Sequence, residues 1–502
     1  MELLIQRLKN TASSLPQSIV VIQNGETYTY SDLWHRVVTV ADRLKCSGLQ
    51  SGQTVAMLME NSIDYIASLY GIWAAGGVTV ALNTALKYRD LNHLVTHCGA
   101  QFLLSDGVHP ELKTFIKDGS DRSLELIDVA SLVTSGQVQS EIAPIENHSE
   151  YELVDIAEDA VASIIYTSGT TGHPKGVTLR QSNLSANTHA ILQSLNISQA
   201  DRVMCVLPFF YSYGNSVLHT HLWAGASLVL ENSFMYPQKV LESMQVNEST
   251  TFCGVPSTFN LLLNRASIAN TALPHLTTVT QAGGAMSKAS ISEFKSAWPQ
   301  ADFYVMYGQT EASARITCLA PDMLDSKLGS VGLPIQGVEL EIRGEDNRSV
   351  PAGEQGEICI QGPNVMAGYW YDPEETQSVL KDGWLYTGDV GYRDEDGYVF
   401  IVGRNREMIK TGAHRIAPQE IEELILEVSG IEECAVVGVP DDLLGQVLKA
   451  VVVLGQDEQV SKQIIMKYCK DNLPQYKMPK QLEFVEALPK TASGKIQKHK
   501  LV

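Results

Sequence analysis

The chain lacks the features that mark secreted and membrane-spanning proteins. No run of about 18 consecutive apolar residues occurs, so the sequence predicts no membrane-spanning helix. Residues 1–7 form too short an apolar run for a secretory signal peptide. The eight cysteines are widely scattered and form no Cys-x-x-Cys pair, which argues against a zinc site and a disulfide framework. Reduced thiols of this kind favour a cytoplasmic protein.

Positive charge is also scarce. The sequence has 37 Lys and Arg residues against 57 Asp and Glu residues, a formal net charge of -20. Such a surface repels polyanions, so we expect no nucleic-acid partner and no binding to anionic membranes. A bound phosphate group would need a local cradle of backbone amides and a few cations.

What is present is an alternation of helix and strand patterns. Apolar periodicity predicts helices over residues 33–44 and 63–75 and buried strands over residues 54–58 and 101–105. The pattern returns further along the chain, with strands expected near residues 163–166, 202–207, 227–230 and 278–281. Strands that alternate with helices predict parallel, doubly wound sheets.

The character of the sequence changes twice after residue 330. Residues 330–402 hold short β-rich segments between Gly, Pro and Asp turns, which predicts an antiparallel sheet or barrel. After Gly403 we expect a helix over residues 418–428, strands over residues 434–439 and 450–454, and a lysine-rich tail. The predicted fold class is α/β, with a large N-terminal domain (1–403) of doubly wound sheets plus a β-barrel-like subdomain. A small α+β C-terminal domain (404–502) would follow.

A loop rich in hydroxyls and glycines follows one predicted strand. Its chemistry-bearing residues are Thr167, Ser168, Gly169, Thr170, Thr171 and Lys175. Small side chains let backbone amides turn toward phosphate oxygens, hydroxyls add donors, and a lysine supplies a point charge. The spacing is not that of a Walker loop, because Lys175 is followed by glycine. Taken alone, the segment also fits a polar surface turn.

Other segments supply the remaining parts of a nucleotide site. Tyr307 offers a ring for adenine, and Thr310 and Glu311 offer a hydroxyl and a carboxylate that can help hold Mg²⁺. Asp389 is suited to two ribose hydroxyls, and Arg404 can add a second ribose contact. Two further segments are a small-residue turn and a lysine near the C-terminus: Gly283, Gly284, Ala285 and Lys495.

These segments, in this order and spacing, resemble the adenylate-forming superfamily of acyl-CoA synthetases, nonribosomal adenylation domains and luciferases. The resemblance covers nearly the whole chain, and residues 356–391 are more similar to acyl-CoA synthetases than to amino-acid adenylation domains. It implies activation of a small carboxylic acid by ATP and Mg²⁺ to acyl-AMP, with release of pyrophosphate. Transfer of the acyl group to the thiol of coenzyme A would follow.

The resemblance also implies a role for each residue. Residues 167–175 would hold the pyrophosphate end of ATP, and Tyr307 would stack on adenine. Thr310 would touch phosphate and Glu311 would assist Mg²⁺. Asp389 and Arg404 would bind the ribose.

In this superfamily the small C-terminal domain is mobile and rotates between the two half-reactions. The resemblance places the hinge near residues 404–406. Lys495 would bridge the substrate carboxylate and the α-phosphate, where two anions must meet and charge develops. After rotation, Lys410 and Gly412 would face the active site instead.

Two departures from the usual pattern concern the C-terminal domain. Arg406 stands where the hinge residue is usually Asp or Lys, and its charge and flexibility suit the position. Ala413 stands where many relatives have a second glycine. If its methyl group narrows the pantetheine channel, thiol transfer is affected and adenylation is not.

The resemblance places the acid pocket among residues 211–217, 255–259, 281–285 and 312–315. The expected contacts are Tyr211, Gly214, Asn215, Val255 and Ser257. Amino-acid adenylation domains usually carry Asp at the position that our alignment gives to Gly214, and residues 209–217 contain no carboxylate. An unpaired buried ammonium would cost several kcal/mol, so we predict a fatty, aromatic or alicyclic acid without a free α-amino group. Tyr211 fits both an aromatic gate and a core tyrosine.

Several alternatives stay open. A stand-alone ligase that loads the phosphopantetheine arm of an acyl or peptidyl carrier protein would use the same lysines. An oxidative, luciferase-like enzyme lacks a supporting flavin or metal pattern. A non-catalytic binding module is disfavoured by the presence of Lys175, Glu311, Asp389 and Lys495. The histidine pairs His93/His97 and His219/His221 have the pattern of structural residues.

Overall fold

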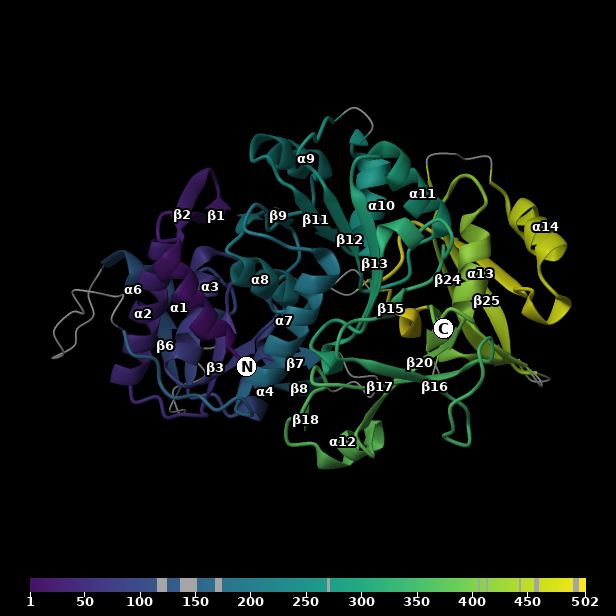
Figure 1. Ribbon diagram of the computed structural model, residues 1–502. Helices are drawn as coiled ribbons and strands as arrows, with labels where there is room; N and C mark the ends of the chain where they lie inside the picture. The colour runs from purple at the N-terminus through teal and green to yellow at the C-terminus, as the bar shows by residue number, and fades with distance from the viewer. Residues whose placement is uncertain are drawn as a thin grey trace.

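Four sheets organise the chain in the computed structural model (Figure 1). The structure describes residues 1–114, 124–135, 151–167, 174–268, 271–404, 407–411, 414–441, 444–455, 460–490 and 496–502. The N-terminal elements lie on one side of the molecule, and the elements of residues 418–472 lie on the opposite side (Figure 1). Within the described ranges, no helix is both long and apolar enough to cross a bilayer.

The first sheet has seven strands in the order β18-β8-β7-β4-β3-β5-β6 among the described residues. Its core strands β7, β4, β3, β5 and β6 are parallel, and β8 and β18 add antiparallel at one edge. The strands are β3 (Thr54–Leu58), β4 (Val78–Ala81), β5 (Phe102–Ser105), β6 (Glu125–Asp128), β7 (Val161–Thr167), β8 (Lys175–Arg180) and β18 (Gly368–Tyr369). The accompanying helices are α1 (Leu4–Ser14), α2 (Tyr30–Cys46), α3 (Ile63–Ala74), α4 (Tyr88–Cys98) and α6 (Val129–Ser135).

The second sheet has nine strands in the order β15-β14-β13-β12-β11-β9-β10-β1-β2. Strands β13, β12, β11, β9, β10 and β1 are parallel, and antiparallel strands close both edges. The strands are β1 (Ile19–Gln23), β2 (Glu26–Thr29), β9 (Arg202–Cys205), β10 (Ser227–Leu230), β11 (Thr251–Gly254), β12 (Thr278–Gln281), β13 (Asp302–Tyr307), β14 (Thr317–Leu319) and β15 (Leu333–Pro334). The helices are α7 (Gln181–Leu195), α8 (Ser212–Ala224), α9 (Pro237–Val246), α10 (Pro256–Arg265) and α11 (Lys288–Ala297).

One hydrophobic core joins these two sheets. It contains Met57 of β3 and Leu228 of β10, together with side chains of α1, α3 and α8. Every residue of β3 is buried, as expected for a parallel strand that is covered on both faces. The two sheets therefore form one packed unit.

A third, antiparallel sheet follows in the region where the sequence predicted a sheet or barrel. It comprises β16 (Glu339–Arg343), β17 (Gly356–Gln361), β19 (Leu380–Lys381), β20 (Trp384–Arg393) and β21 (Val399–Arg404). The short helix α12 (Pro373–Val379) starts at the N-cap Asp372, whose side chain accepts a hydrogen bond from the Glu375 amide.

The C-terminal residues form a separate sheet with its own core. Ile409, Ile421, Val436 and Val452 are among the buried side chains of this core. The elements are β22 (Ile409–Thr411), β23 (His414–Ile416), α13 (Pro418–Leu426), β24 (Ile431–Asp441), β25 (Gly445–Leu454), α14 (Lys462–Asn472) and β26 (Gln481–Val485).

The predicted elements agree with this architecture. Strands β3, β10 and β12 have the predicted bounds, and the α/β fold class is confirmed. Strand β9 ends at Cys205, before the predicted residue 207, because its neighbour β10 ends opposite at Leu230. Helix α2 begins earlier than predicted, at Tyr30, because Thr29 and Asp32 form a capping box.

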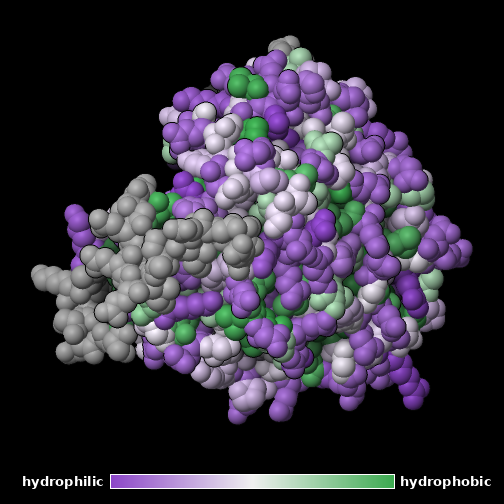
Figure 2. Space-filling model, turned by 60° about the vertical axis from the view of Figure 1, so that its left-hand side comes forward, coloured by the Kyte–Doolittle hydropathy of each residue, from purple (hydrophilic) through white to green (hydrophobic). Residues whose placement is uncertain are grey.

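The molecular surface fits the acidic composition. The face in Figure 2 is mostly hydrophilic, and its apolar residues are scattered or gathered in small groups. Among the described residues, three of the lysines in the predicted basic tail form ion pairs with acidic residues of the same C-terminal sheet and its helices. These pairs are Lys477–Glu420, Lys490–Glu433 and Lys498–Glu422.

Candidate active site

Asp389 lies at the junction of three elements. Its Oδ2 accepts a hydrogen bond from the Tyr307 hydroxyl at 2.6 Å, and its Oδ1 lies 3.1 Å from Nε of Arg404. The antiparallel register of β20 and β21 places Asp389 opposite Arg404, and Tyr307 reaches both from the end of β13. The Asp389 side chain is only 6% exposed, so the arginine compensates a nearly buried charge. The three residues predicted to contact adenosine are therefore in direct contact.

The protonation state of the Tyr307 hydroxyl follows from its surroundings. Burial, and then the neighbouring Asp389 charge, raises the pKa of the Tyr307 hydroxyl well above its ordinary value. The hydroxyl therefore stays protonated and donates to the carboxylate. The residue is 8% exposed, so its ring presents little open surface in this structure, and stacking on adenine stays a prediction.

The loop after Tyr307 folds back tightly on itself. A side chain at Gly308 would place its Cβ 1.6 Å from the carbonyl oxygen of Ala314, so only glycine allows this approach. Ser313 and Ala314 both have positive φ, 53° and 96°, which is uncommon for residues other than glycine. The strained turn presents Thr310 and Glu311 on a short 3₁₀ helix (Thr310–Ala312).

Tyr369 connects two of the predicted phosphate-binding segments. Its hydroxyl donates to Oε1 of Glu311 at 2.9 Å, and its ring centroid lies 5.2 Å from Nζ of Lys175. The short strand β18 pairs with β8 and so brings Tyr369 beside Lys175. Lys175 also forms an ion pair with Glu375 of α12. Sequence reasoning missed Tyr369, and its only signal was a position within the acyl-CoA-synthetase-like run of residues 356–391.

Thr167 and Lys175 frame the hydroxyl-rich loop. They pair across the β7–β8 ladder, so both ends of the loop lie at the same edge of the first sheet. Thr310 Oγ1 lies 3.1 Å from Oγ of Ser212, the first residue of α8. Four predicted residues of this group lie outside the described residues: Ser168, Gly169, Thr170 and Thr171.

The turn of Gly283, Gly284 and Ala285 follows β12 and is exposed. Gly283 has φ of 86°, and Nε2 of Gln281 donates to the Gly284 carbonyl at 2.7 Å. The turn is thus held in place while its backbone stays open, as a planar ligand would require.

The C-terminal lysines are only partly described. Lys410 lies in β22, and nothing is described of its side chain. The segment that carries Lys495 lies outside the described residues, as do Arg406, Gly412 and Ala413. On either side of the Lys495 segment, Lys490 and Ile496 form an antiparallel bridge.

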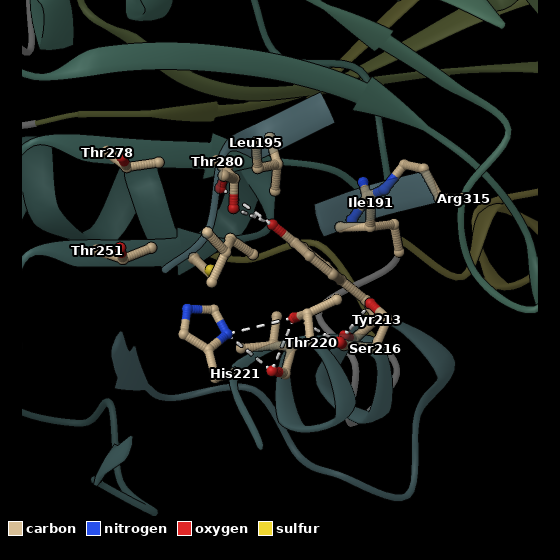
Figure 3. Close-up of a pocket in the computed structure, with 13 residues that line it drawn as sticks. Ile191, Leu195, Tyr213, Ser216, Thr220, His221, Thr251, Thr278, Thr280 and Arg315 are labelled. Atoms are coloured by element: carbon tan, nitrogen blue, oxygen red, sulfur yellow. Dashed lines mark hydrogen bonds between the residues drawn. The ribbon is translucent and has the colours of Figure 1, made fainter. Parts of the chain in front are cut away.

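A small cavity lies between helices α7 and α8 and strands β11 and β12 (Figure 3). The cavity volume is ≈ 10 Å³, which is about enough to hold one water molecule. Four lining residues fall in the segments predicted for the acid pocket: Tyr213, Ser216, Val217 and Arg315. They come from the sheet-facing side of α8 and from the loop before β14.

The five predicted acid contacts do not line this cavity. A Cβ at Gly214 would lie 2.3 Å from the carbonyl oxygen of Pro208, so this position packs α8 against the preceding turn. Gly214 as a contact of the acid stays a prediction, and the residues of α8 that border this cavity include Tyr213 and Ser216. The remaining predicted contacts are half-buried or buried at the start of α8 (Tyr211 and Asn215) and at the start of α10 (Val255 and Ser257).

Tyr211 and the paired histidines have identifiable neighbours. The Tyr211 hydroxyl accepts from Nδ2 of Asn83 at 3.2 Å. Nδ1 of His219 is hydrogen-bonded to the Tyr70 hydroxyl, and Nδ1 of His221 to the Val217 carbonyl, both at 2.9 Å. Burial lowers the pKa of His219 to about 3 and that of His221 to about 4, so both rings are neutral near pH 7.

The residues fit magnesium held mainly by phosphate. Among the described residues no group of three or more His, Cys, Asp or Glu side chains is placed to hold a metal ion. Glu311 has one carboxylate oxygen engaged by Tyr369, which leaves the other for a cation. Mg²⁺ typically binds one or two carboxylates together with substrate phosphates and water.

Comparison with known proteins identifies the family of the chain. The profile of the AMP-binding enzyme family matches residues 8–370, and that of the AMP-binding enzyme C-terminal domain matches residues 420–495. A feruloyl-CoA synthase from Amycolatopsis sp is 33% identical over 485 residues, covering 96% of this chain and 95% of the relative. A 2-succinylbenzoate–CoA ligase from Bacillus licheniformis is 31% identical over 495 residues, covering 98% of each.

A solved structure gives the same result in three dimensions. The o-succinylbenzoate CoA synthetase from Bacillus subtilis, in complex with its acyl-adenylate intermediate, superposes with a TM-score of 0.86 at 29% identity. The match covers 99% of this chain and 97% of that one. The activity is therefore ATP- and Mg²⁺-dependent conversion of a carboxylic acid to acyl-AMP, followed by transfer to CoA. The chain belongs to the AMP-binding enzyme family, as an AMP-forming acid–thiol ligase of the acyl-CoA synthetase type.

Proposed function

We propose that two junctions, at Asp389 and Tyr369, assemble the nucleotide site of this ligase. The contact of Tyr307, Asp389 and Arg404 supports a ribose-binding role for the carboxylate and the guanidinium. The contacts of Tyr369 with both Glu311 and Lys175 are the observation that supports a triphosphate-binding role for these two residues. Glu311 would hold Mg²⁺, which neutralises triphosphate charge when bound, and Lys175 would attract the pyrophosphate oxygens.

The substrate is an acid without a free α-amino group. Among the described residues that line the cavity beside α8 there is no carboxylate to pair with an ammonium. Arg315, in the cavity wall, would repel an ammonium group. The apolar and aromatic lining of Ile191, Leu195 and Tyr213 suits a fatty or aromatic acid instead.

The C-terminal unit, residues 404–502, turns between the two half-reactions about a hinge near residues 404–406. Its separate core supports movement as one body. Lys495 would act in adenylation and Lys410 in thiol transfer. The phosphopantetheine arm of a carrier protein is the alternative acceptor, since it presents the same thiol. The eight free cysteines support residence in the cytoplasm.

ATP–pyrophosphate exchange across a panel of carboxylic acids tests this function. We expect exchange with aromatic or fatty acids, none with proteinogenic amino acids, and thioester formation with free CoA. Exchange with amino acids alone would contradict the assigned acid class. Acyl-AMP that reacts with a loaded carrier protein but not with CoA would favour the alternative acceptor.

A further inference from the structure

Arg315 is a buried cation without an acidic partner. The residue is 3% exposed, and its Nε has no hydrogen-bond partner. In the described part of the chain, no carboxylate forms an ion pair with it. Its guanidinium carbon lies 5.1 Å from the ring centroid of Tyr213, and such a contact only partly offsets the loss of water around a charge.

The surrounding structure fixes this arginine in place. Asn187 of α7 accepts from the Arg315 amide at 3.2 Å and donates to its carbonyl at 2.9 Å. Asn364 donates to the same carbonyl at 3.0 Å. The positive φ angles of Ser313 and Ala314 turn the chain into this position. Backbone strain and two buried amides are thus used to hold a charged side chain in the interior.

The guanidinium borders the cavity between α8 and the second sheet. Figure 3 shows Arg315 at one end of the lining residues, with Tyr213 crossing toward Thr280, to whose Oγ1 its hydroxyl is bonded at 2.8 Å. The cavity has room for about one water-sized group. Guanidinium N–H groups only donate, so the matching occupant is an oxygen that accepts hydrogen bonds and carries negative charge.

We propose that Arg315 determines substrate specificity by binding an oxygen at the end of the acid remote from the reacting carboxylate. This inference rests on the proposed acid pocket beside α8. Tyr213 adjoins Ser212, which contacts Thr310 of the nucleotide site, so an acid lying along α8 would reach from the phosphate to Arg315. The substrate class is an aromatic or extended acid with a second carboxylate or an ionisable hydroxyl.

Matched pairs of acids test the proposal. Terephthalate and 4-hydroxybenzoate are compared with 4-methylbenzoate, and adipate with heptanoate, by kcat/KM in ATP–pyrophosphate exchange. In the wild type, we expect an oxygen-bearing acid to be preferred by about tenfold or more, the usual range for hydrogen bonds to a charged group. Arg315→Met should reduce this ratio to near one, and Arg315→Lys should retain part of it.

Arg202→Met is the matched control. Arg202 lies in strand β9 of the second sheet, and its Nη1 is bonded to the Asn247 carbonyl at 2.6 Å, away from the cavity. The Arg202→Met substitution should leave the selectivity ratio between the paired acids unchanged. Thermal melting and AMP binding are measured for both variants to check that they fold. Equal use of the paired acids by the wild type, or an unchanged ratio in Arg315→Met, would overturn the inference alone. If none of these acids supported ATP–pyrophosphate exchange, the proposed acid class and this inference would both be overturned.

Discussion

Tyr369 contacts two predicted nucleotide-binding residues through two different parts of one side chain. The hydroxyl bonds to Glu311, and the ring faces Lys175. A substitution can therefore separate the two contacts. This separation makes Tyr369 the most informative single position for the arrangement of the triphosphate.

Tyr369→Phe removes the hydrogen bond to Glu311 and keeps the ring beside Lys175. We expect the KM for Mg-ATP to rise roughly tenfold or more, since one hydrogen bond to a charged group is lost. Tyr369→Leu should raise it further because the ring contact is lost as well. Steady-state kinetics at varied Mg²⁺ measure both, and equal effects of the two variants would contradict separate roles for hydroxyl and ring.

Asp389→Ala removes the predicted acceptor for two ribose hydroxyls. The loss of two charge-assisted hydrogen bonds, roughly 3–5 kcal/mol, should lower kcat/KM for ATP by two or more decades. Asp394→Ala is the control, because Asp394 follows the same strand but pairs with Lys327 at 2.7 Å. Near-normal ATP kinetics in Asp389→Ala would show that the ribose binds elsewhere.

Sequence patterns found the residues whose type fits a nucleotide and missed those whose role depends on neighbours. Lys175, Glu311 and Asp389 stand in recognisable segments. Tyr369 and Arg315 do not, because their contacts arise only when β18 meets β8 and when the loop before β14 turns inward. For the same reason the sequence did not show that position 214 faces Pro208.

At the scale of elements, the turn that joins β13 to β14 carries the strain of the site. Its shape requires a glycine at one end and positive φ angles at the other. The adjoining strands are held in antiparallel register from Val305–Leu319 to Tyr307–Thr317. The turn therefore cannot relax without loosening the strands that position Tyr307.

Gly308→Ala should disturb this turn. The added methyl group would meet the Ala314 carbonyl, and we expect a loss of about 2 kcal/mol or more of stability with a higher KM for ATP. Gly455→Ala serves as the control, because its methyl group would lie 3.7 Å from the nearest atom. Calorimetric melting and ATP kinetics compare the two variants; equal melting temperatures would mean that the turn tolerates a side chain.

Elements with strong local patterns were predictable, and long-range pairing was not. Strand β3 has its predicted bounds because a short, largely apolar run is enough to define a buried strand. Strand β1 was missed, although its residues 20–22 are buried, because its partner β10 lies far along the chain. Local periodicity contains no information about such a partner.

At the scale of the whole molecule, the two half-reactions should depend on different lysines. Lys495→Ala should abolish pyrophosphate exchange and still transfer the acyl group from supplied acyl-AMP to CoA. Lys410→Ala should show the reverse bias, since it belongs to the rotated conformer. Lys490→Ala is the control, because Lys490 pairs with Glu433 within the C-terminal unit. Equal loss of both steps in each mutant would contradict the rotation.

The pairing of β1 with β10 also has a consequence during protein synthesis. Val21 lies beside Leu228, so β1 leaves the ribosome roughly 200 residues before its neighbour. At about 5–20 residues per second, the wait lasts on the order of 10–40 seconds. A nascent chain stalled before Ser227 should be cut by protease within residues 19–23, and one stalled well after Leu230 should resist. Until then β1 can pair only with β2, and the edge that later meets β10 stays open to aggregation.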